Sequence, residues 1–294
     1  MSRYKTPLRY PGGKQKLAPF ILELMKKNSL HGGHYVEPYA GGAGIAIELL
    51  LSGKAERIHL NDSCTGVYAF WQSVLSKPEE LCRRISRASM TIDEWRRQKD
   101  IFSRQSEFEQ IDVGFSVFYL NRCNRSGILS GGVIGGLKQE GEWKMDVRFP
   151  RNELISRIEA IASRKSAITL KNWDAEKFIF KYVPKLPAST LVYCDPPYFR
   201  KADRLYLNHY EPEDHARIAQ VIQREIKRHW VVSYDGAPEI MKHYSRRRSF
   251  LYSLQYNAAK AYKGTEVFFF SDSLKLPQES AVPYIDRALK KLAA

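Results

Sequence analysis

The sequence predicts an α/β fold: a doubly wound, mostly parallel sheet with an antiparallel C-terminal edge strand, plus an inserted, mostly helical lobe. Short apolar runs alternate with helical patterns along the chain, which is typical of parallel strands joined by covering helices. A glycine-rich turn follows the first of these runs, where doubly wound folds bind ligands. A long break in the alternation predicts the lobe.

The expected strands are residues 35–36, 57–60, 167–170, 191–194 and 230–233, with helical patterns between several of them, as over 45–52 and 215–228. Residues 249–256 and 266–270 have the pattern of two further strands joined by a polar turn, which we expect at the antiparallel edge. The break in the pattern covers roughly 75–165. We therefore expect one domain from residues 1–74 and 166–294, with residues 75–165 inserted into it as a lobe.

The charge of the chain points to an acidic partner. Lys and Arg number 47 against 32 Asp and Glu, a net charge of +15, which favours a polyanion such as nucleic acid. We expect no membrane span and no secretion signal, because the apolar runs are short and the N-terminus is polar. The four cysteines form no CxxC pair and the seven histidines show no ligand-like spacing, so we expect reduced thiols and no metal site.

The turn after the first strand, "VEPYAGGAG", lacks the GxGxxG spacing of a pyrophosphate site and carries an acid, Glu37. A carboxylate beside phosphates is repulsive, whereas beside a cationic ligand it is favourable. Asp62 follows the second strand about 20 residues after Gly41, where such folds present an acid to ribose hydroxyls. A positively charged nucleoside, S-adenosylmethionine, fits both features. The alternatives are a helix N-cap for Asp62 and an ordinary turn for the glycines.

A second turn, "RYPGGK", lies near the start of the chain and ends at Lys14. This segment could line a ligand pocket or touch phosphates, or it could be an ordinary turn with a solvated lysine. Its residues alone leave these alternatives open.

The run "LVYCDPPY" takes an apolar strand directly into Asp195, two prolines and Tyr198. The prolines end the sheet pairing and fix the backbone. A carboxylate and a rigid carbonyl can each accept one N–H of an exocyclic base amine and expose its lone pair, while the tyrosine ring stacks on the base. A second aromatic from residues 206–210 could close the other face or belong to the core. The alternative for the whole run is a strand-terminating turn.

With these motifs in order, the chain resembles the N6-adenine DNA methyltransferases of the Dam-like (D12, alpha) class. The matching segments cover most of the chain and follow the order of the family: "RYPGGK", "VEPYAGGAG", "LND" (60–62), the inserted lobe, "NWD" (172–174), "DPPY" (195–198), "VVSYDG" (231–236) and "KGTEVFFFS" (263–271). The joint order is more specific than any single motif.

The resemblance implies a Rossmann-like methyltransferase sheet and transfer of a methyl group from S-adenosylmethionine to N6 of an adenine flipped out of duplex DNA. It implies these cofactor-binding residues: Tyr10, Gly12, Lys14, Glu37, Pro38, Tyr39, Gly41, Gly42, Asp62, Asp174 and Asp195. It implies these catalytic residues: Asp195, Pro196, Pro197 and Tyr198. Tyr10 stands where close relatives often have tryptophan, a mild departure, since either ring could pack on the cofactor.

The lobe segment "NRCNRSG", residues 121–127, is expected to contact DNA. Arg reads guanine and Asn reads adenine through bidentate pairs in the major groove, although a solvated loop touching only phosphates is the alternative. We expect this glycine-rich segment to form a loop or a hairpin, with Lys138 and Arg148 following it, on the other strand if it is a hairpin, as phosphate contacts. The expected DNA-binding residues are Arg122, Asn124, Arg125, Ser126, Lys138 and Arg148.

Two other functions stay open on the residues: an RNA adenine methyltransferase, and a non-catalytic nucleic-acid-binding relative. The position of the lobe, between the glycine turn and "DPPY", favours double-stranded DNA, and the intact tetrapeptide argues against a non-catalytic relative. The loop does not match Dam-type lobes closely, so the target sequence is open. We expect a cytoplasmic, DNA-associated protein, either solitary or paired with a restriction endonuclease.

Overall fold

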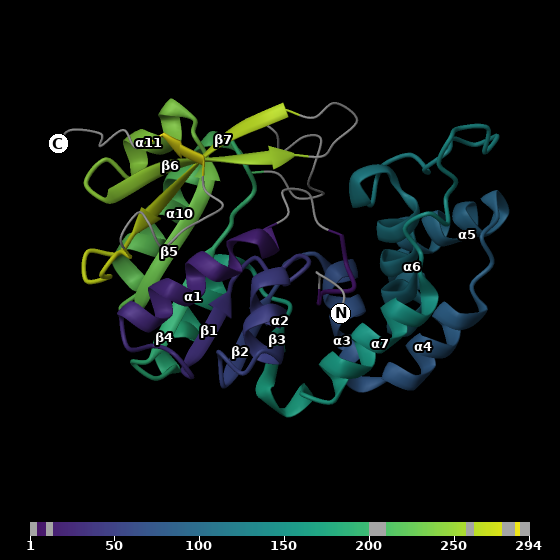
Figure 1. Ribbon diagram of the computed structural model, residues 1–294, viewed down its shortest axis with the longest axis horizontal. Coiled ribbons are helices and arrows are strands. Elements are labelled where there is room, and N and C mark those ends of the chain that lie inside the picture. Colours follow the sequence, from purple (N-terminus) through teal and green to yellow (C-terminus); the bar gives the residue numbers. More distant parts are fainter. Residues whose placement is uncertain (1–4, 10–13, 200–209, 257–261, 278–285, 289–294) are drawn as a thin grey trace.

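The computed structural model describes residues 5–9, 14–199, 210–256, 262–277 and 286–288. The expected α/β alternation is confirmed: parallel strands are separated by helices along the chain (Figure 1). The described strands are β1 (His34–Glu37), β2 (Arg57–Asn61), β3 (Ile168–Lys171), β4 (Thr190–Cys194), β5 (His229–Asp235), β6 (Arg248–Tyr256), β7 (Tyr262–Phe270) and β8 (Asp286–Ala288).

These strands form a single mixed sheet in the order β3-β2-β1-β4-β5-β7-β6-β8. Strands β1 to β5 run parallel, with Tyr35 of β1 opposite both Ile58 of β2 and Leu191 of β4. The expected antiparallel edge is confirmed, but it is wider than predicted. Strand β7 pairs with β5 and β6 pairs with β7, while β8, which the sequence did not predict, pairs with β6.

Two buried clusters of apolar side chains cover the two faces of the sheet. Successive residues of one strand alternate between them: Val231 belongs to one cluster and Val232 to the other. Both faces of the sheet are thus covered, and β4 at its centre is buried along its whole length. The helices against the sheet are α1 (Ala18–Lys27) and α2 (Gly44–Leu51) on one face, and α8 (Ala175–Lys181), α10 (Pro212–Glu225) and α11 (Pro238–His243) on the other.

The helices between β2 and β3 gather on one side of the molecule (Figure 1). They are α3 (Thr65–Ser76), α4 (Pro78–Arg87), α5 (Ile92–Ser103), α6 (Gln110–Cys123) and α7 (Arg151–Ala162). Helix α3 packs against both α6 and α7, so it belongs with the lobe helices as much as with the sheet. The division of the chain at residues 75 and 165 stays a prediction. Short 3-10 helices complete the chain: η1 (Lys14–Leu17), η2 (Gln105–Glu107), η3 (Arg125–Gly127), η4 (Lys165–Ala167) and η5 (Val183–Lys185).

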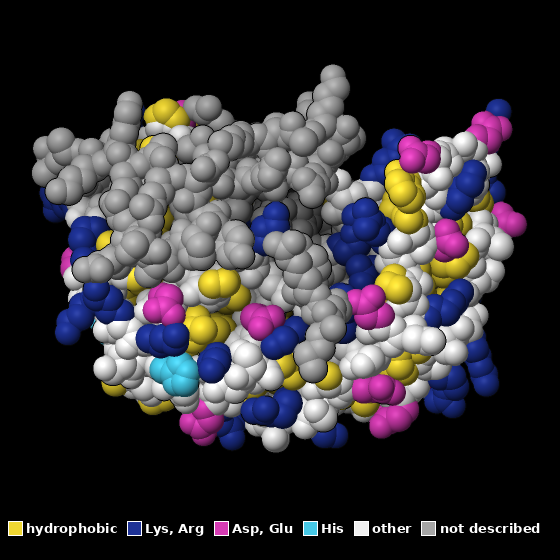
Figure 2. Space-filling model, in the orientation of Figure 1, with side chains coloured by type: hydrophobic (Ala, Val, Ile, Leu, Met, Phe, Trp, Pro, Cys, Tyr) yellow, Lys and Arg dark blue, Asp and Glu magenta, His cyan; other side chains and the backbone are white. Residues whose placement is uncertain are grey.

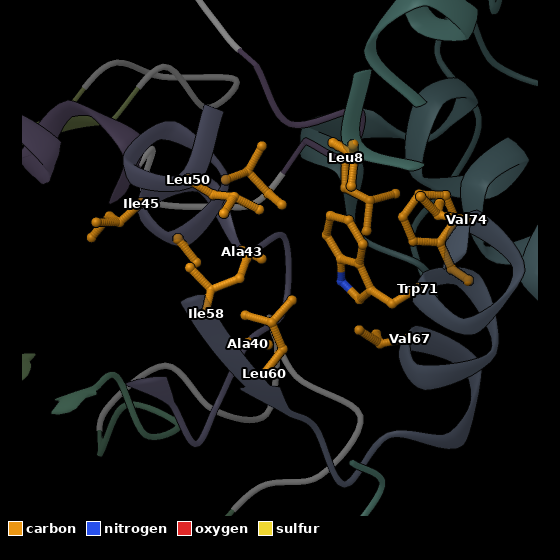
Figure 3. Close-up of a cluster of buried hydrophobic side chains, with 14 of the residues drawn as sticks. Leu8, Ala40, Ala43, Ile45, Leu50, Ile58, Leu60, Val67, Trp71 and Val74 are labelled. Atoms are coloured by element: carbon orange, nitrogen blue, oxygen red, sulfur yellow. The ribbon is translucent and has the colours of Figure 1, made fainter. Parts of the chain in front are cut away.

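Trp71 of α3 joins the lobe to the sheet. Its ring lies among Leu8, Val67 and Val74 and points from α3 toward α2 and β2 (Figure 3). The residue is almost completely buried. The indole Nε1 donates to the carbonyl oxygen of Gly41 at 2.8 Å. The lobe is therefore anchored directly on the glycine turn that follows β1.

Sequence signals explain where several helices begin. Thr91 caps α5 by accepting from the Glu94 N–H at 3.2 Å. Helix α10 starts with Pro212, and the Asp214 carboxylate accepts from the Glu211 N–H at 3.0 Å, as in a capping box. No helix among the described residues is long and apolar enough to cross a membrane.

Candidate active site

Five acidic side chains gather at the carboxyl ends of the parallel strands. Glu37 ends β1, Asp62 follows β2, and Asp195 follows β4. Asp235 ends β5, and its partner on β7 is Glu266. The chain leaves β1 toward β2 and leaves β4 toward β5, in opposite directions along the sheet. The boundary of β1 and β4 is therefore the topological switch point, where open α/β sheets bind ligands.

The glycine turn and Asp62 are brought together as predicted. The Gly41 N–H donates to Oδ2 of Asp62 at 2.8 Å, while Oδ1 accepts from the Cys64 N–H at 2.9 Å. Gly41 and Ala43 both have positive φ, of 46° and 45°, a region that favours glycine at the first position. Thr6 donates from its hydroxyl to the carbonyl of Gly42. Asp62 and Thr6 thus hold the turn from two sides.

The two acids beside this turn differ in charge at neutral pH. Burial raises the pKa of Glu37 to about 8, although the Ala46 N–H, 3.2 Å from Oε1, opposes the shift. Burial also raises the pKa of Asp62, to about 6, against the two N–H groups that it accepts. Asp62 is therefore mostly ionised at pH 7, whereas Glu37 is mostly neutral, so the charge expected from Glu37 is largely absent.

Lys14 stands at the centre of a buried polar cluster. Its Nζ lies 3.1 Å from Oδ1 of Asp195 and 2.8 Å from Oε2 of Glu266. Burial alone lowers the pKa of Lys14, but the charges of Asp195 and Glu266 outweigh it and raise the pKa well above its ordinary value. Lys14 is therefore a charged residue committed to two carboxylates, rather than the solvated lysine of an ordinary turn.

Asp195 is held through one of its two oxygens. Ser233 donates from Oγ to Oδ1 at 2.6 Å, the same oxygen that faces Lys14, and the Tyr193 hydroxyl lies 2.7 Å from that Ser233 Oγ. No hydrogen bond to Oδ2 is found within the described ranges. Burial raises the pKa of Asp195, while the charge of Lys14 opposes the shift. The carboxylate is thus oriented, with its second oxygen available as an acceptor.

Tyr198 is fixed at both its hydroxyl and its ring. The hydroxyl donates to Oε1 of Glu266 at 2.8 Å, and Nζ of Lys14 lies 5.1 Å from the ring centroid. Only 4% of Tyr198 is exposed, and Pro196 and Pro197 are also buried. Stacking of Tyr198 on a base stays a prediction, and it needs a ring more exposed than this. Phe199, whose N–H donates to Asp235 at 3.0 Å, is only half-buried.

The remaining expected cofactor residues are less central. Tyr10 and Gly12 lie outside the described residues, as do residues 206–209 of the second aromatic segment. Tyr39 is half-buried, with its hydroxyl 3.1 Å from that of Tyr210. Asp174 is exposed at the end of β3 and caps α8 by accepting from the N–H groups of Glu176 and Lys177. Contact between Asp174 and the cofactor stays a prediction.

Of the two alternatives expected in the lobe, a glycine-rich loop or a hairpin, the structure has the loop. Residues 124–150 form turns and the short helix η3, and their ladder is reduced to a single bridge between Asn124 and Val133. Arg125, Lys138 and Arg148 are exposed on this loop, and Ser126 is half-buried with a φ of 57°. The glycines favoured turns over strands here, since Gly127, Gly135 and Gly136 all have positive φ.

Asn124 does not read a base in this structure. It is completely buried: its Oδ1 accepts from Trp95 Nε1 at 2.7 Å, and its Nδ2 donates to the carbonyls of Ile128 and Leu129. Base reading by Asn124 stays a prediction, and it requires this amide to leave the contacts that hold the loop. The neighbouring Asn121 likewise holds the N-terminal segment, accepting from the Arg9 N–H at 2.7 Å and donating to its carbonyl at 2.6 Å.

Sequence reasoning missed the partners of the central cluster. Glu266 is 1% exposed and accepts from Lys14, Tyr198 and the Tyr252 hydroxyl. An acid within the otherwise apolar run "EVFFF" was the available signal, because a charge in a strand covered on both faces needs partners. Ser233, in the middle of β5, gave no comparable signal. No group of three or more metal-ligating side chains is found in the described part of the chain.

Comparison with known proteins assigns the chain to a family. The family model described as D12 class N6 adenine-specific DNA methyltransferase matches residues 10–262. The chain is also similar to two solved structures of the rRNA methyltransferase aviRa from Streptomyces viridochromogenes, at 1.5 Å and 2.4 Å. For each the identity is 13%, the match covers 89% of this chain and 86% of that chain, and the TM-score is 0.33, too low to support an argument. No curated protein matches the chain.

Proposed function

The chain belongs to the D12 class of N6 adenine-specific DNA methyltransferases, and on that premise we propose that it transfers a methyl group from S-adenosylmethionine to N6 of an adenine flipped out of duplex DNA. The observation that carries the proposal is the geometry of Asp195. This carboxylate stands at the switch point of the sheet, oriented through Oδ1 by Lys14 and Ser233.

The strand ends suit S-adenosylmethionine, which supplies a methyl group carried on a positively charged sulfur. The positive φ of Gly41 lets a ligand approach the backbone closely. Asp62, which is mostly ionised, would accept hydrogen bonds from the ribose hydroxyls. With its carboxylates ionised, the cluster of Lys14, Asp195 and Glu266 carries one net negative charge. That charge attracts a sulfonium and repels the phosphates of a dinucleotide.

Asp195 and the carbonyl of Pro196 would accept the two N–H bonds of the adenine amine. The amine lone pair is otherwise delocalised into the ring, so these two acceptors would expose it for in-line attack on the methyl carbon. The S–CH3 bond would break as the N–CH3 bond forms, S-adenosylhomocysteine would leave, and the methylated amine would then lose its extra proton to Asp195 or water. Asp195 need not be a strong base, because the amine becomes acidic only once it is methylated. Orientation and electrostatics supply most of the rate in such a site.

The lobe would bind the DNA that carries the substrate adenine. An adenine inside a duplex cannot reach the strand ends, so the base must leave the stack. The molecule is hollowed between the lobe and the sheet-bearing part, and Lys and Arg side chains gather along this hollow (Figure 2). Exposed Arg125 and Lys138 on the lobe loop suit contacts to DNA.

Replacing Asp195 with alanine tests the proposed role. Asp195→Ala is expected to lose methyl transfer to duplex DNA by at least about a hundredfold, while binding of the same duplex changes little. Transfer is measured with labelled S-adenosylmethionine and binding by fluorescence anisotropy. Asp272→Ala is the matched control, because that carboxylate is exposed and pairs with Arg247 at the surface. Turnover of Asp195→Ala at the wild-type rate would rule out the assigned role.

A further inference from the structure

Arg122, in the last turn of α6, is a buried cation that has no counterion of its own among the described residues. Only 6% of the residue is exposed, and its Nε has no hydrogen-bond partner. No ion pair or hydrogen bond of its guanidinium is found among the residues that the structure describes. Burying a charge is costly unless it is paired, so this position requires an explanation.

Other partly buried arginines of the lobe do have partners. Arg84 pairs with Asp112 at 2.5 Å. Arg151 donates to the carbonyls of Ile85 and Ala88, both at 2.6 Å, at the end of α4. These two arginines hold helices together. Arg122 differs from them because its burial satisfies no other group of the described chain.

Three further arginines, from separate segments, lie close enough to Arg122 for their charges to act on it. Arg9 comes from the N-terminal segment, which Asn121 clamps, and its Nη1 donates to the Asn124 carbonyl at 3.3 Å. Arg157 comes from α7, donates to the Thr6 carbonyl at 2.9 Å and pairs with Glu153. Arg148 is exposed on the loop before α7.

Burial and the positive charges of these three arginines lower the pKa of Arg122. Burial, then the charges of Arg157, Arg9 and Arg148, lower the pKa of Arg122 to about 9, and Glu153 opposes the shift only in part. Burial and the charge of Arg148 also lower the pKa of Arg9. Four guanidiniums therefore repel one another around one acid, and Arg122 stays mostly charged at neutral pH.

We propose that Arg9, Arg122, Arg148 and Arg157, here called the arginine cradle, form an anion site whose ligand is a phosphate of the DNA backbone. The proposal rests on the proposed function for the identity of the polymer. A phosphate is favoured over a base edge because converging guanidiniums match a full negative charge and its several acceptor oxygens. Arg9 and Arg148 keep exposed surface, so the ligand approaches from their side.

The cradle changes the role expected for Arg122. As a phosphate ligand, Arg122 fixes the register of the duplex without reading its sequence. Two members of the cradle are fixed before DNA arrives, since the Arg9 and Arg157 guanidiniums donate to the carbonyls of Asn124 and Thr6. DNA would then supply the counterion that Arg122 lacks among the described residues.

The test measures the salt dependence of DNA binding by Arg122→Met and Arg148→Gln. At low salt, each variant is expected to bind duplex DNA about tenfold more weakly than wild type, and by the same factor for unrelated sequences. The plot of the logarithm of the binding constant against the logarithm of the salt concentration should be less steep by about one. Arg148 is exposed, so its variant stays informative if Arg122→Met does not fold. Arg83→Gln, which removes an exposed arginine of α4, is the control and should leave the slope unchanged.

A second arm uses inorganic phosphate alone, at constant ionic strength, and follows thermal unfolding. Phosphate should stabilise the wild-type chain and Arg83→Gln but not Arg122→Met. Without phosphate, Arg122→Met should unfold at the wild-type temperature or above, because it removes an uncompensated buried charge.

Three outcomes would overturn the proposal: an unchanged salt slope in both cradle variants, equal phosphate stabilisation of Arg122→Met and wild type, or a loss of affinity confined to one DNA sequence. Failure of the proposed function has a different signature. Wild-type chain that methylates structured RNA and not DNA would refute the polymer assignment while leaving the phosphate arm intact.

Discussion

At the residue scale, the site depends on one lysine shared by two buried carboxylates. Asp195 and Glu266 both face Nζ of Lys14, and Tyr198 and Tyr252 donate to Glu266. Each charge would be costly alone, and each is compensated by the others. Glu266 therefore acts through its neighbours: it fixes the Tyr198 ring and holds Lys14 against Asp195. We regard it as a positioning residue.

Replacing Glu266 with glutamine separates positioning from folding. Glu266→Gln leaves Lys14 with one carboxylate and is expected to lower kcat by about tenfold to a hundredfold, with less change in KM for DNA. Its unfolding free energy should fall by roughly 1–3 kcal/mol. Steady-state kinetics and urea unfolding check both values, with Asp272→Asn as the surface control. A variant that loses stability but keeps the wild-type kcat would reduce Glu266 to a structural role.

The sequence identified some of these residues for a physical reason. "DPPY" and the glycine turn are contiguous motifs whose chemistry is visible locally, and Asp62 could be placed from its spacing after Gly41. Glu266 could not, because its role depends on pairing across β5 and β7. The burial of Asn124 was not predictable, because its partner Trp95 lies on another helix and no local pattern reveals the contact.

At the element scale, the alternation of strands and helices was predictable because each parallel strand is a short apolar run. The choice between a loop and a hairpin in the lobe was not predictable, since a glycine-rich segment fits turns and strands about equally well. One unpredicted contact links β1, β2 and the end of α8. The ring nitrogens of His59 lie 2.9 Å from the Tyr182 hydroxyl and 3.0 Å from Nδ1 of His34. This chain of hydrogen bonds connects the end of α8 to β2 and β1.

That chain predicts a pH dependence of stability. Burial, then the charges of His34 and Arg57, lower the pKa of His59 to about 4, so the unfolded chain binds a proton more readily than the folded chain. The contribution is fully present above about pH 6.5 and is lost as the pH falls toward 4, by at most about 3 kcal/mol. Urea unfolding from pH 7 to 4 should show a flatter slope for His59→Gln than for wild type or His31→Gln, an exposed control. Identical slopes for all three chains would contradict this account.

At the scale of the whole molecule, charge is distributed unevenly. Acidic side chains gather at the strand ends, whereas the N-terminal segment and the lobe contribute the arginine cradle. The net charge of +15 therefore coexists with a locally acidic centre. This distribution suits a chain that holds an anionic polymer on its lobe and a cationic methyl donor at its sheet. Composition alone indicated the polymer, but the separation of the two signs needed the fold.

The most direct test of the central claim is a competition between substrates. The 294-residue chain is incubated with labelled S-adenosylmethionine and equal amounts of duplex DNA and structured RNA, and the products are digested to nucleosides and separated. The account predicts label in N6-methyl-2′-deoxyadenosine. Label in ribonucleosides, or on a base other than adenine, would contradict it.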